Sequence, residues 1–110
     1  MTEATNEYHE VAKTDDLDDE EVMAVFIKGR EIALYNIGGE FYATDGICTH
    51  ENVGLADGFV DGDIIECPLH GGKFEIKTGK PASPPVTVGI KTYPVKIEGD
   101  SVLVGVAAEN

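Results

Sequence analysis

Four residues of this chain have the chemistry of metal ligands, and they form two short groups. Cys48 and His50 are separated by one residue, whereas Cys67 and His70 are separated by two. Each group offers one thiolate and one imidazole, which are ligands of zinc and iron sites. The sixteen residues between the groups contain Asp61-Gly62, a dipeptide typical of a hairpin turn. We therefore expect two loops that lie side by side at one tip of the fold.

The spacing of these ligands leaves three interpretations. A disulfide between Cys48 and Cys67 would not explain why each cysteine is followed by a histidine. A structural zinc site usually pairs Cys with Cys at separations of about 2–4 residues and His with His at about 3–5. A Rieske-type [2Fe–2S] centre needs the mixture seen here, with two Cys on one iron and two His on the other. The spacing favours the cluster, and a structural zinc module is the alternative.

Two boxes surround the ligands, Cys48-Thr49-His50-Glu51 and Cys67-Pro68-Leu69-His70-Gly71-Gly72. They resemble the cluster-binding boxes of the Rieske iron–sulfur proteins. Other segments resemble the small Rieske ferredoxins of bacterial aromatic-ring-hydroxylating dioxygenase systems, such as those for naphthalene and biphenyl. These segments are Leu55-Ala56-Asp57-Gly58, Ile65-Glu66, Phe74, Thr78-Gly79 and Lys91-Thr92-Tyr93-Pro94-Val95-Lys96. The resemblance runs from about Tyr8 to Val106, nearly the whole chain.

The resemblance implies one [2Fe–2S] cluster, with Cys48 and Cys67 on the inner iron and His50 and His70 on the outer iron. Two Fe³⁺, two sulfides and two thiolates then sum to zero charge, so the cluster is easier to reduce than one with four thiolates. High-potential members of the family have a hydroxyl residue where Gly72 stands and a tyrosine where Phe74 stands. We therefore predict a potential near the lower end of the Rieske range, at about −150 mV.

The resemblance and the histidine count together predict an electron carrier and not an enzyme. A Rieske oxygenase needs a second iron held by two histidines and a carboxylate. Only His9 remains of the three histidines, and we expect it to be an ordinary, partly exposed side chain. The chain also lacks the Gly-x-Gly-x-x-Gly fingerprint of a dinucleotide-binding reductase. With an oxygenase and a reductase disfavoured, we expect a ferredoxin. It would accept an electron from a flavoprotein reductase and pass it to a terminal oxygenase.

The alternative within the same family is the small subunit of another oxidoreductase, such as an assimilatory nitrite reductase. Such a permanent subunit is expected to show a conspicuous hydrophobic face. For the carrier, we expect a small contact centred on His50 and His70, with Glu51, Leu55 and Leu69 at its rim.

Charge and hydropathy limit the partners and the location. The net charge is −13, from 8 basic and 21 acidic residues. Such a surface disfavours binding to nucleic acid and to anionic membranes. The longest apolar run, Val22–Ile27, has six residues, far fewer than the ~20 that span a bilayer. The polar, acidic start of the chain does not resemble a signal peptide. We expect a soluble, cytoplasmic monomer.

The apolar pattern predicts an all-β protein of about 8–10 short antiparallel strands in a sandwich or barrel. Expected strands cover Tyr8–Lys13, Val22–Ile27, Glu31–Ile37, Phe41–Ala43, Gly58–Val60, Asp63–Glu66, Lys73–Ile76, Lys91–Glu98 and Ser101–Val106. The acidic run Asp15–Glu21 is expected to be an exposed loop. Pro81–Pro85 is expected to be an extended loop, because prolines cannot donate backbone hydrogen bonds.

The turns predict how these strands are connected. Gly38-Gly39, Asp61-Gly62 and Gly99-Asp100 each lie between apolar runs, as hairpin turns do. The whole chain, residues 1–110, is expected to be one Rieske [2Fe–2S] domain. Both Cys/His groups fall in an inserted, hairpin-rich lobe at about residues 46–72.

Overall fold

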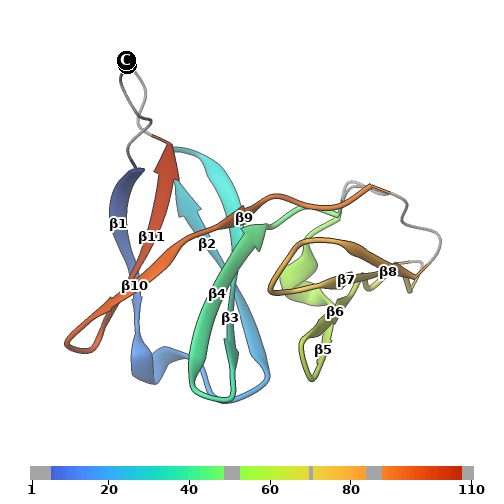
Figure 1. Cartoon of the computed structure of the whole chain (residues 1–110), viewed down its shortest axis with the longest axis horizontal. Helices are drawn as coiled ribbons and strands as arrows, with labels where there is room; N and C mark the ends of the chain where they lie inside the picture. The colour runs from blue at the N-terminus through green and yellow to red at the C-terminus, as the bar shows by residue number, and fades with distance from the viewer. Residues whose placement is uncertain (1–5, 49–52, 70, 84–87, 108–110) are drawn as a thin grey trace.

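The chain folds almost entirely into antiparallel strands, as the sequence predicts (Figure 1). The computed structural model describes residues 6–48, 53–69, 71–83 and 88–107. In these ranges the strands are β1 (Asn6–Lys13), β2 (Glu21–Ile27), β3 (Arg30–Ile37), β4 (Glu40–Asp45), β5 (Phe59–Asp61), β6 (Ile64–Glu66), β7 (Lys73–Glu75), β8 (Pro81–Ser83), β9 (Thr92–Tyr93), β10 (Val95–Glu98) and β11 (Ser101–Ala107). Two short 3-10 helices, η1 (Thr14–Asp16) and η2 (Leu55–Asp57), complete these elements. Neither helix is long or apolar enough to cross a membrane.

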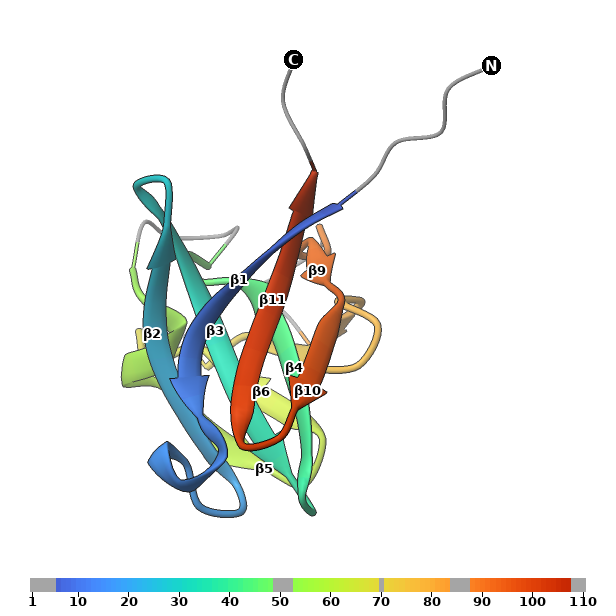
Figure 2. The same ribbon diagram turned by 90° about the vertical axis from the view of Figure 1, so that its left-hand side faces the viewer.

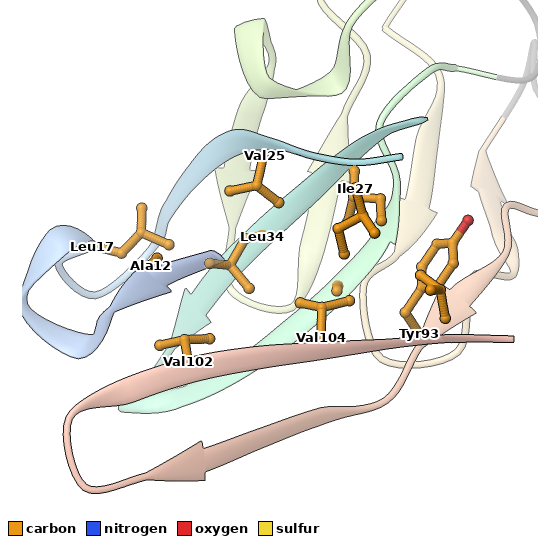
Figure 3. Close-up of a cluster of buried hydrophobic side chains, with 11 residues drawn as sticks. Ala12, Leu17, Val25, Ile27, Leu34, Tyr93, Val102 and Val104 are labelled. Atoms are coloured by element: carbon orange, nitrogen blue, oxygen red, sulfur yellow. The ribbon is translucent and has the colours of Figure 1, made fainter. Parts of the chain in front are cut away.

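Two sheets form a sandwich (Figure 2). One sheet has the order β1-β11-β10 and the other β2-β3-β4-β9, and every pair of neighbours is antiparallel. Figure 3 shows the apolar side chains between them, which come from both sheets and from Leu17. We call this group the sandwich core; its buried members are Ala12, Leu17, Val25, Ile27, Ile32, Leu34, Ala43, Tyr93, Val102, Val104 and Val106.

A third sheet, β5-β6-β7-β8, belongs to a lobe beside the sandwich (Figure 1). Its apolar side chains pack with side chains from the outer face of the β2-β3-β4-β9 sheet. We call this second group the lobe core; its buried members are Ala33, Tyr35, Cys48, Leu55, Ile65, Cys67, Phe74, Ile76 and Ile90. The sheet of the lobe includes β7 and β8, which follow Gly72, so it extends beyond the segment 46–72 in which the sequence places the ligands.

Strand β3 links the two cores, because successive side chains of a strand point to opposite faces. Ile32 and Leu34 belong to the sandwich core, whereas Ala33 and Tyr35 belong to the lobe core. All four side chains have no exposed surface. This explains why Glu31–Ile37 is almost continuously apolar instead of alternating with polar residues.

Two predicted hairpin turns are confirmed, and the third is shifted by one residue. Gly38 and Gly39 connect β3 to β4 with φ of +64° and +91°, a conformation that glycine adopts readily. Gly99-Asp100 connects β10 to β11. In the lobe, Asp61 pairs with Ile64, so the two-residue turn is Gly62-Asp63 and not Asp61-Gly62.

Two predictions around prolines are wrong. The single strand expected over Lys91–Glu98 is split at Pro94 into β9, which pairs with β4, and β10, which pairs with β11. The segment expected to be a loop contains β8 (Pro81–Ser83), which pairs with β7. Proline is tolerated there because β8 is the edge strand of its sheet. Pro84 and Pro85 lie outside the described residues.

Strand β2 is buried on only one of its two faces. Val22–Ile27 forms the predicted strand, but only Val25 and Ile27 are buried, and Phe26 is 65% exposed. The strand lies at the edge of its sheet. The acidic run that precedes it is exposed except for Leu17, which packs into the sandwich core.

Candidate metal centre

The two predicted thiol ligands lie together in the lobe core. Cys48 comes after β4 and Cys67 comes directly after β6, so different elements position them. Their exposed fractions are 4% and 2%, and both pack in the same cluster of buried side chains. Neither Cys48 nor Cys67 forms a disulfide. A disulfide, one of the interpretations that the spacing left open, is therefore not what connects these two segments.

The first ligand loop is closed at its base by backbone hydrogen bonds. The Cys48 N–H donates to the Val53 carbonyl (3.0 Å), and the Leu55 N–H donates to the Gly46 carbonyl (2.7 Å). These bonds bring both ends of the segment 49–52 together. His50 belongs to that segment and lies outside the described residues, as does Glu51.

The second ligand loop is closed in a similar way, and it starts from the other cysteine. The Cys67 N–H donates to the Gly72 carbonyl (2.7 Å), and the Gly71 N–H donates to the Cys67 carbonyl (3.2 Å). Gly71 has φ of +72°, which favours glycine over other residues. Gly71 therefore lets the backbone turn at the end of this loop. His70 lies outside the described residues.

The backbone after the first loop lies very close to the strand that leads into the second loop. Gly58 follows η2, and a Cβ atom at this position would lie 2.1 Å from the carbonyl oxygen of Glu66. Glu66 is the residue before Cys67. Only glycine allows this approach, which places η2 directly against the strand that leads into the second loop.

The buried hydroxyl groups of Tyr35 and Thr44 form hydrogen bonds with each other and with the backbone. The Thr44 hydroxyl donates to the Asp45 carbonyl (2.8 Å) and lies 2.8 Å from the Tyr35 hydroxyl. Because the Thr44 hydroxyl already donates its one proton to Asp45, the Tyr35 hydroxyl is the donor in the bond between Tyr35 and Thr44. Burial raises the pKa of Tyr35 far above its ordinary value, so it keeps this proton. Phe74 packs in the same core and has no hydroxyl to offer.

The sequence prediction missed Tyr35 and Thr44, although one signal for Tyr35 was present. A tyrosine inside the otherwise apolar strand Glu31–Ile37 has a hydroxyl that needs a partner when the strand is buried. Nothing in the sequence identifies Thr44 as that partner. The β3–β4 register pairs Thr44 with Ala33, two residues before Tyr35 on the same face of β3, and this brings the two hydroxyl groups together.

The residues expected at the rim of the partner contact differ in their exposure. Leu69 is 56% exposed, whereas Leu55 has no exposed surface and belongs to the lobe core. Leu55 was therefore wrongly expected at the rim: it begins η2, which turns its side chain inward against the sheet. Another large apolar side chain, Val88, is 64% exposed.

His9 lies on β1, in the sandwich and not in the lobe. It is partly exposed, as expected, and its Nε2 atom lies 3.6 Å from a carboxylate oxygen of Glu7. Among the described residues, no three His, Cys, Asp or Glu side chains are grouped so that they could hold a metal ion. Two of the four predicted ligands, His50 and His70, are outside that set.

The chemistry of the donors that are described fits a metal cluster. Two thiols that form no disulfide are buried in one apolar core, each at the start of a segment whose ends are joined by backbone hydrogen bonds. Thiolates buried without a nearby positive charge would be costly. A metal centre supplies that charge. Geometry at the cysteines alone does not separate iron from zinc.

Comparisons with known proteins separate them. The sequence model of the Rieske [2Fe–2S] domain matches residues 7–94. The ferredoxin component of the naphthalene 1,2-dioxygenase system of Pseudomonas aeruginosa is 52% identical over 84 residues, which are 76% of this chain and 81% of the relative. The ferredoxin of Sphingomonas yanoikuyae B1 superimposes with a TM-score of 0.85 at 43% identity, over 89% of this chain and 97% of the other.

Two further solved structures bear on the role of the chain. A chain from the complex of reduced oxygenase and oxidized ferredoxin in carbazole 1,9a-dioxygenase has a TM-score of 0.85 at 39% identity, covering 88% of this chain and 91% of that one. The small subunit of a putative NADH-dependent nitrite reductase from Mycobacterium tuberculosis also has a TM-score of 0.85, covering 96% of this chain and 99% of that one. Its identity is only 18%, so this likeness concerns the fold alone.

Proposed function

Because the chain belongs to the Rieske [2Fe–2S] domain family, we propose that it carries single electrons from a flavoprotein reductase to a terminal ring-hydroxylating oxygenase. The chain carries one [2Fe–2S] cluster and is an electron-transfer protein, not a catalytic enzyme. The observation that carries the proposal is the 52% identity to the ferredoxin component of a dioxygenase system. A nitrite reductase subunit is disfavoured, because that likeness has only 18% identity.

The cluster ligands in this proposal are Cys48, His50, Cys67 and His70. Their support is that each cysteine lies buried at the base of a closed loop, and that each loop contains one of the two histidines in its sequence. When bound, the cluster takes up and releases one electron. The chain buries Cys48 and Cys67 in the lobe core, which keeps water away from the thiolate side.

A low potential is part of the proposal. Hydrogen bonds to the cluster sulfurs raise the potential of a Rieske centre. The Tyr35 hydroxyl donates to Thr44 instead, and Gly72 and Phe74 have no hydroxyl. The side chains named here therefore stabilise the reduced state only weakly, which suits a carrier that passes its electron onward.

The contact with each partner is proposed to be small and brief. Leu69 precedes His70 in the chain and is more than half exposed, so it offers apolar surface next to the proposed histidine ligand. Electron-transfer interfaces typically bury less than about 1,200 Å². The relative in the carbazole system forms a complex with its oxygenase, and the same kind of partner is proposed for this chain.

We further infer that the chain is one domain, residues 1–110, that works as a monomer in the cytoplasm. Support for a single domain comes from β3, whose two faces belong to the two cores. Support for a reducing compartment comes from the two cysteines, which are not joined in a disulfide.

The experiment that tests this function is single-electron transfer with purified components. The holoprotein is reduced by a flavoprotein ferredoxin reductase with NADH under anaerobic conditions, mixed with an oxidised ring-hydroxylating oxygenase, and its spectrum is followed in a stopped-flow instrument. Reduction followed by rapid reoxidation on mixing supports the proposal. A holoprotein that is reduced but is not reoxidised by the oxygenase contradicts it.

Electron paramagnetic resonance tests the ligand assignment separately. The His50→Cys and His70→Cys variants are expected to lose the Rieske signal of the reduced protein, because thiolates replace the imidazoles of one iron. His9→Asn is the matched control, since it removes the remaining histidine, and should leave the signal unchanged. An unchanged signal in either of the first two variants would exclude that histidine as a ligand.

A further inference from the structure

An exposed aromatic side chain lies near the base of the first ligand loop. Phe26 belongs to the edge strand β2, and 65% of its surface is exposed. Single exposed apolar side chains are common in soluble proteins and by themselves indicate no partner. The position of Phe26 in the sheet distinguishes it, and this position follows from the register of β2 and β3.

The strand register places Phe26 on the face of the sheet against which the lobe packs. Phe26 pairs with Glu31 of β3, and residues directly opposite each other in a ladder share a face. Glu31 is two residues before Ala33, a member of the lobe core, so it lies on the same face. Val22, four residues before Phe26 on that face, packs partly buried against the lobe core. Phe26 therefore lies where this row of side chains leaves the cover of the lobe.

Glu31 connects this place to the loop that contains His50. Its carbonyl accepts a hydrogen bond from the Gly46 N–H at 3.0 Å. Its side chain reaches both ends of the loop. A Cβ atom at Gly46 would lie 2.8 Å from the Glu31 Cγ atom, and one at Gly54 would lie 3.1 Å from a Glu31 carboxylate oxygen. Phe26 is thus the ladder partner of the residue that contacts both ends of the first ligand loop.

Two carboxylates meet at the base of this loop. The Asp57 carboxylate lies 3.9 Å from the same Cβ position at Gly54 that Glu31 approaches. Asp57 belongs to η2, which packs against β2 and β3 (Figure 2). Among the residues that the structure describes, neither carboxylate forms an ion pair with a basic side chain. Like charges at this separation repel each other, so basic groups of a partner would be favourable here.

We propose, on the basis of the proposed function, that Phe26 is an apolar anchor for the terminal oxygenase, with Glu31 and Asp57 at its acidic rim. The oxygenase is the partner of choice because a relative of this chain forms a complex with one. It would offer an apolar recess for the ring, bordered by lysine or arginine side chains. An acceptor that covers the loop of His50 is already beside Phe26, so one continuous contact reaches both.

The test is stopped-flow reoxidation of the reduced holoprotein at increasing concentrations of the oxidised oxygenase. The half-saturating concentration reports binding, and the maximal rate reports electron transfer within the complex. Phe26→Ala should raise the half-saturating concentration at least about fivefold, because truncating a buried aromatic anchor weakens binding by that order. The maximal rate should stay within about twofold of wild type. Reduction by the flavoprotein reductase should proceed at the wild-type rate.

Matched variants separate a docking role from a structural one. Phe26→Leu keeps an apolar side chain and should bind within about twofold of wild type. Ile97→Ala is the control, since Ile97 is 46% exposed on β10, in the sheet against which the lobe does not pack, and it should leave both constants unchanged. The redox potential and the melting temperature should match wild type in every variant. Phe26→Lys serves if Phe26→Ala is unstable, and it should weaken binding at least as much.

Three outcomes would overturn the proposal. One is wild-type binding by a folded Phe26→Ala variant with an unchanged potential. Another is equal weakening by Ile97→Ala, which would assign the effect to a general loss of apolar surface. The last is slower reduction by the reductase with unchanged binding to the oxygenase, which would assign Phe26 to the other partner. Wild-type holoprotein that passes no electron to the oxygenase would contradict the proposed function itself, so the two failures are distinguishable in one experiment.

Discussion

The sandwich and the lobe differ in what stabilises them, although both pack against β3. The sandwich has long strands, such as the eight residues of β1 and of β3 and the seven of β11. Strands β5, β6, β7 and β8 have three residues each. Short strands form few ladder hydrogen bonds and are marginal by themselves. The sandwich is therefore stabilised by its own packing, whereas the stability of the lobe depends on the cluster that its two loops are proposed to bind.

The composition of the two cores agrees with this difference. The sandwich core contains aliphatic side chains and one tyrosine, and it has no group that binds a metal. The lobe core contains both cysteines. Metal binding and folding are coupled when the unbound ligands have no other way to be satisfied. We therefore expect the cluster to stabilise the lobe and to contribute little to the stability of the sandwich.

Loss of a cysteine ligand should have the largest effect, and it should be confined to the lobe. Cys67→Ser removes one thiolate from the buried site, so we expect loss of the cluster and of its visible absorption. Amide hydrogen exchange should then accelerate in β5–β8 by at least about 100-fold, while β3 and β11 keep most of their protection. Mass spectrometry of exchanged fragments measures both regions at once. Uniform acceleration over the whole chain would show that the sandwich also depends on the cluster.

A cavity in the sandwich should have the opposite signature. Leu34 has no exposed surface and belongs to the sandwich core. Leu34→Ala should lower the free energy of unfolding by about 2–5 kcal/mol, while the potential of the cluster stays the same. Chemical denaturation and redox titration give the two values. Phe26→Ala is the control, because Phe26 is exposed on an edge strand and its removal should cost less than about 1 kcal/mol.

Hydrogen bonding to sulfur should separate two aromatic residues of the lobe core. Phe74→Tyr introduces a hydroxyl where high-potential Rieske proteins have one, and the potential should rise by roughly 60–130 mV, the equivalent of about 1.5–3 kcal/mol. Tyr35→Phe removes a hydroxyl that bonds to Thr44, so stability should fall by about 1 kcal/mol with no change in potential. Protein-film voltammetry measures both potentials. A shift in Tyr35→Phe as large as that in Phe74→Tyr would mean that Tyr35 reaches the sulfurs.

Sequence reasoning reaches much of this architecture because local signals carry it. Consecutive residues predict the strand β3 and its turn at Gly38-Gly39. Each cysteine likewise has a histidine two or three residues after it in the sequence. Other features depend on residues far apart in the chain. Pro94 ends one strand pairing and begins another only because β4 and β11 are both within reach. Leu55 was expected at the surface, but the structure places it in the lobe core, where it begins η2.

The smallest effect should come from single surface charges, and it should depend on which region bears them. Residues 46–90 have six acidic and three basic residues, a net charge of −3, whereas the remaining residues carry −10. Figure 1 shows η1 on the side of the sandwich away from β5–β8. Charges farther apart than the Debye length, about 8 Å at physiological salt, are largely screened. Only acidic residues of the lobe should therefore steer a basic partner to the cluster loops, despite the greater charge of the sandwich.

Asp57 and Asp15 offer a matched pair for this question, since both are exposed and belong to 3-10 helices, η2 in the lobe and η1 in the sandwich. Asp57→Asn should slow association with the oxygenase about twofold at low salt, and the difference should vanish near 0.5 M NaCl. Asp15→Asn should leave the rate unchanged at every salt concentration. Stopped-flow reoxidation of the reduced ferredoxin measures both rates. Equal slowing by the two variants would mean that the overall charge steers the encounter.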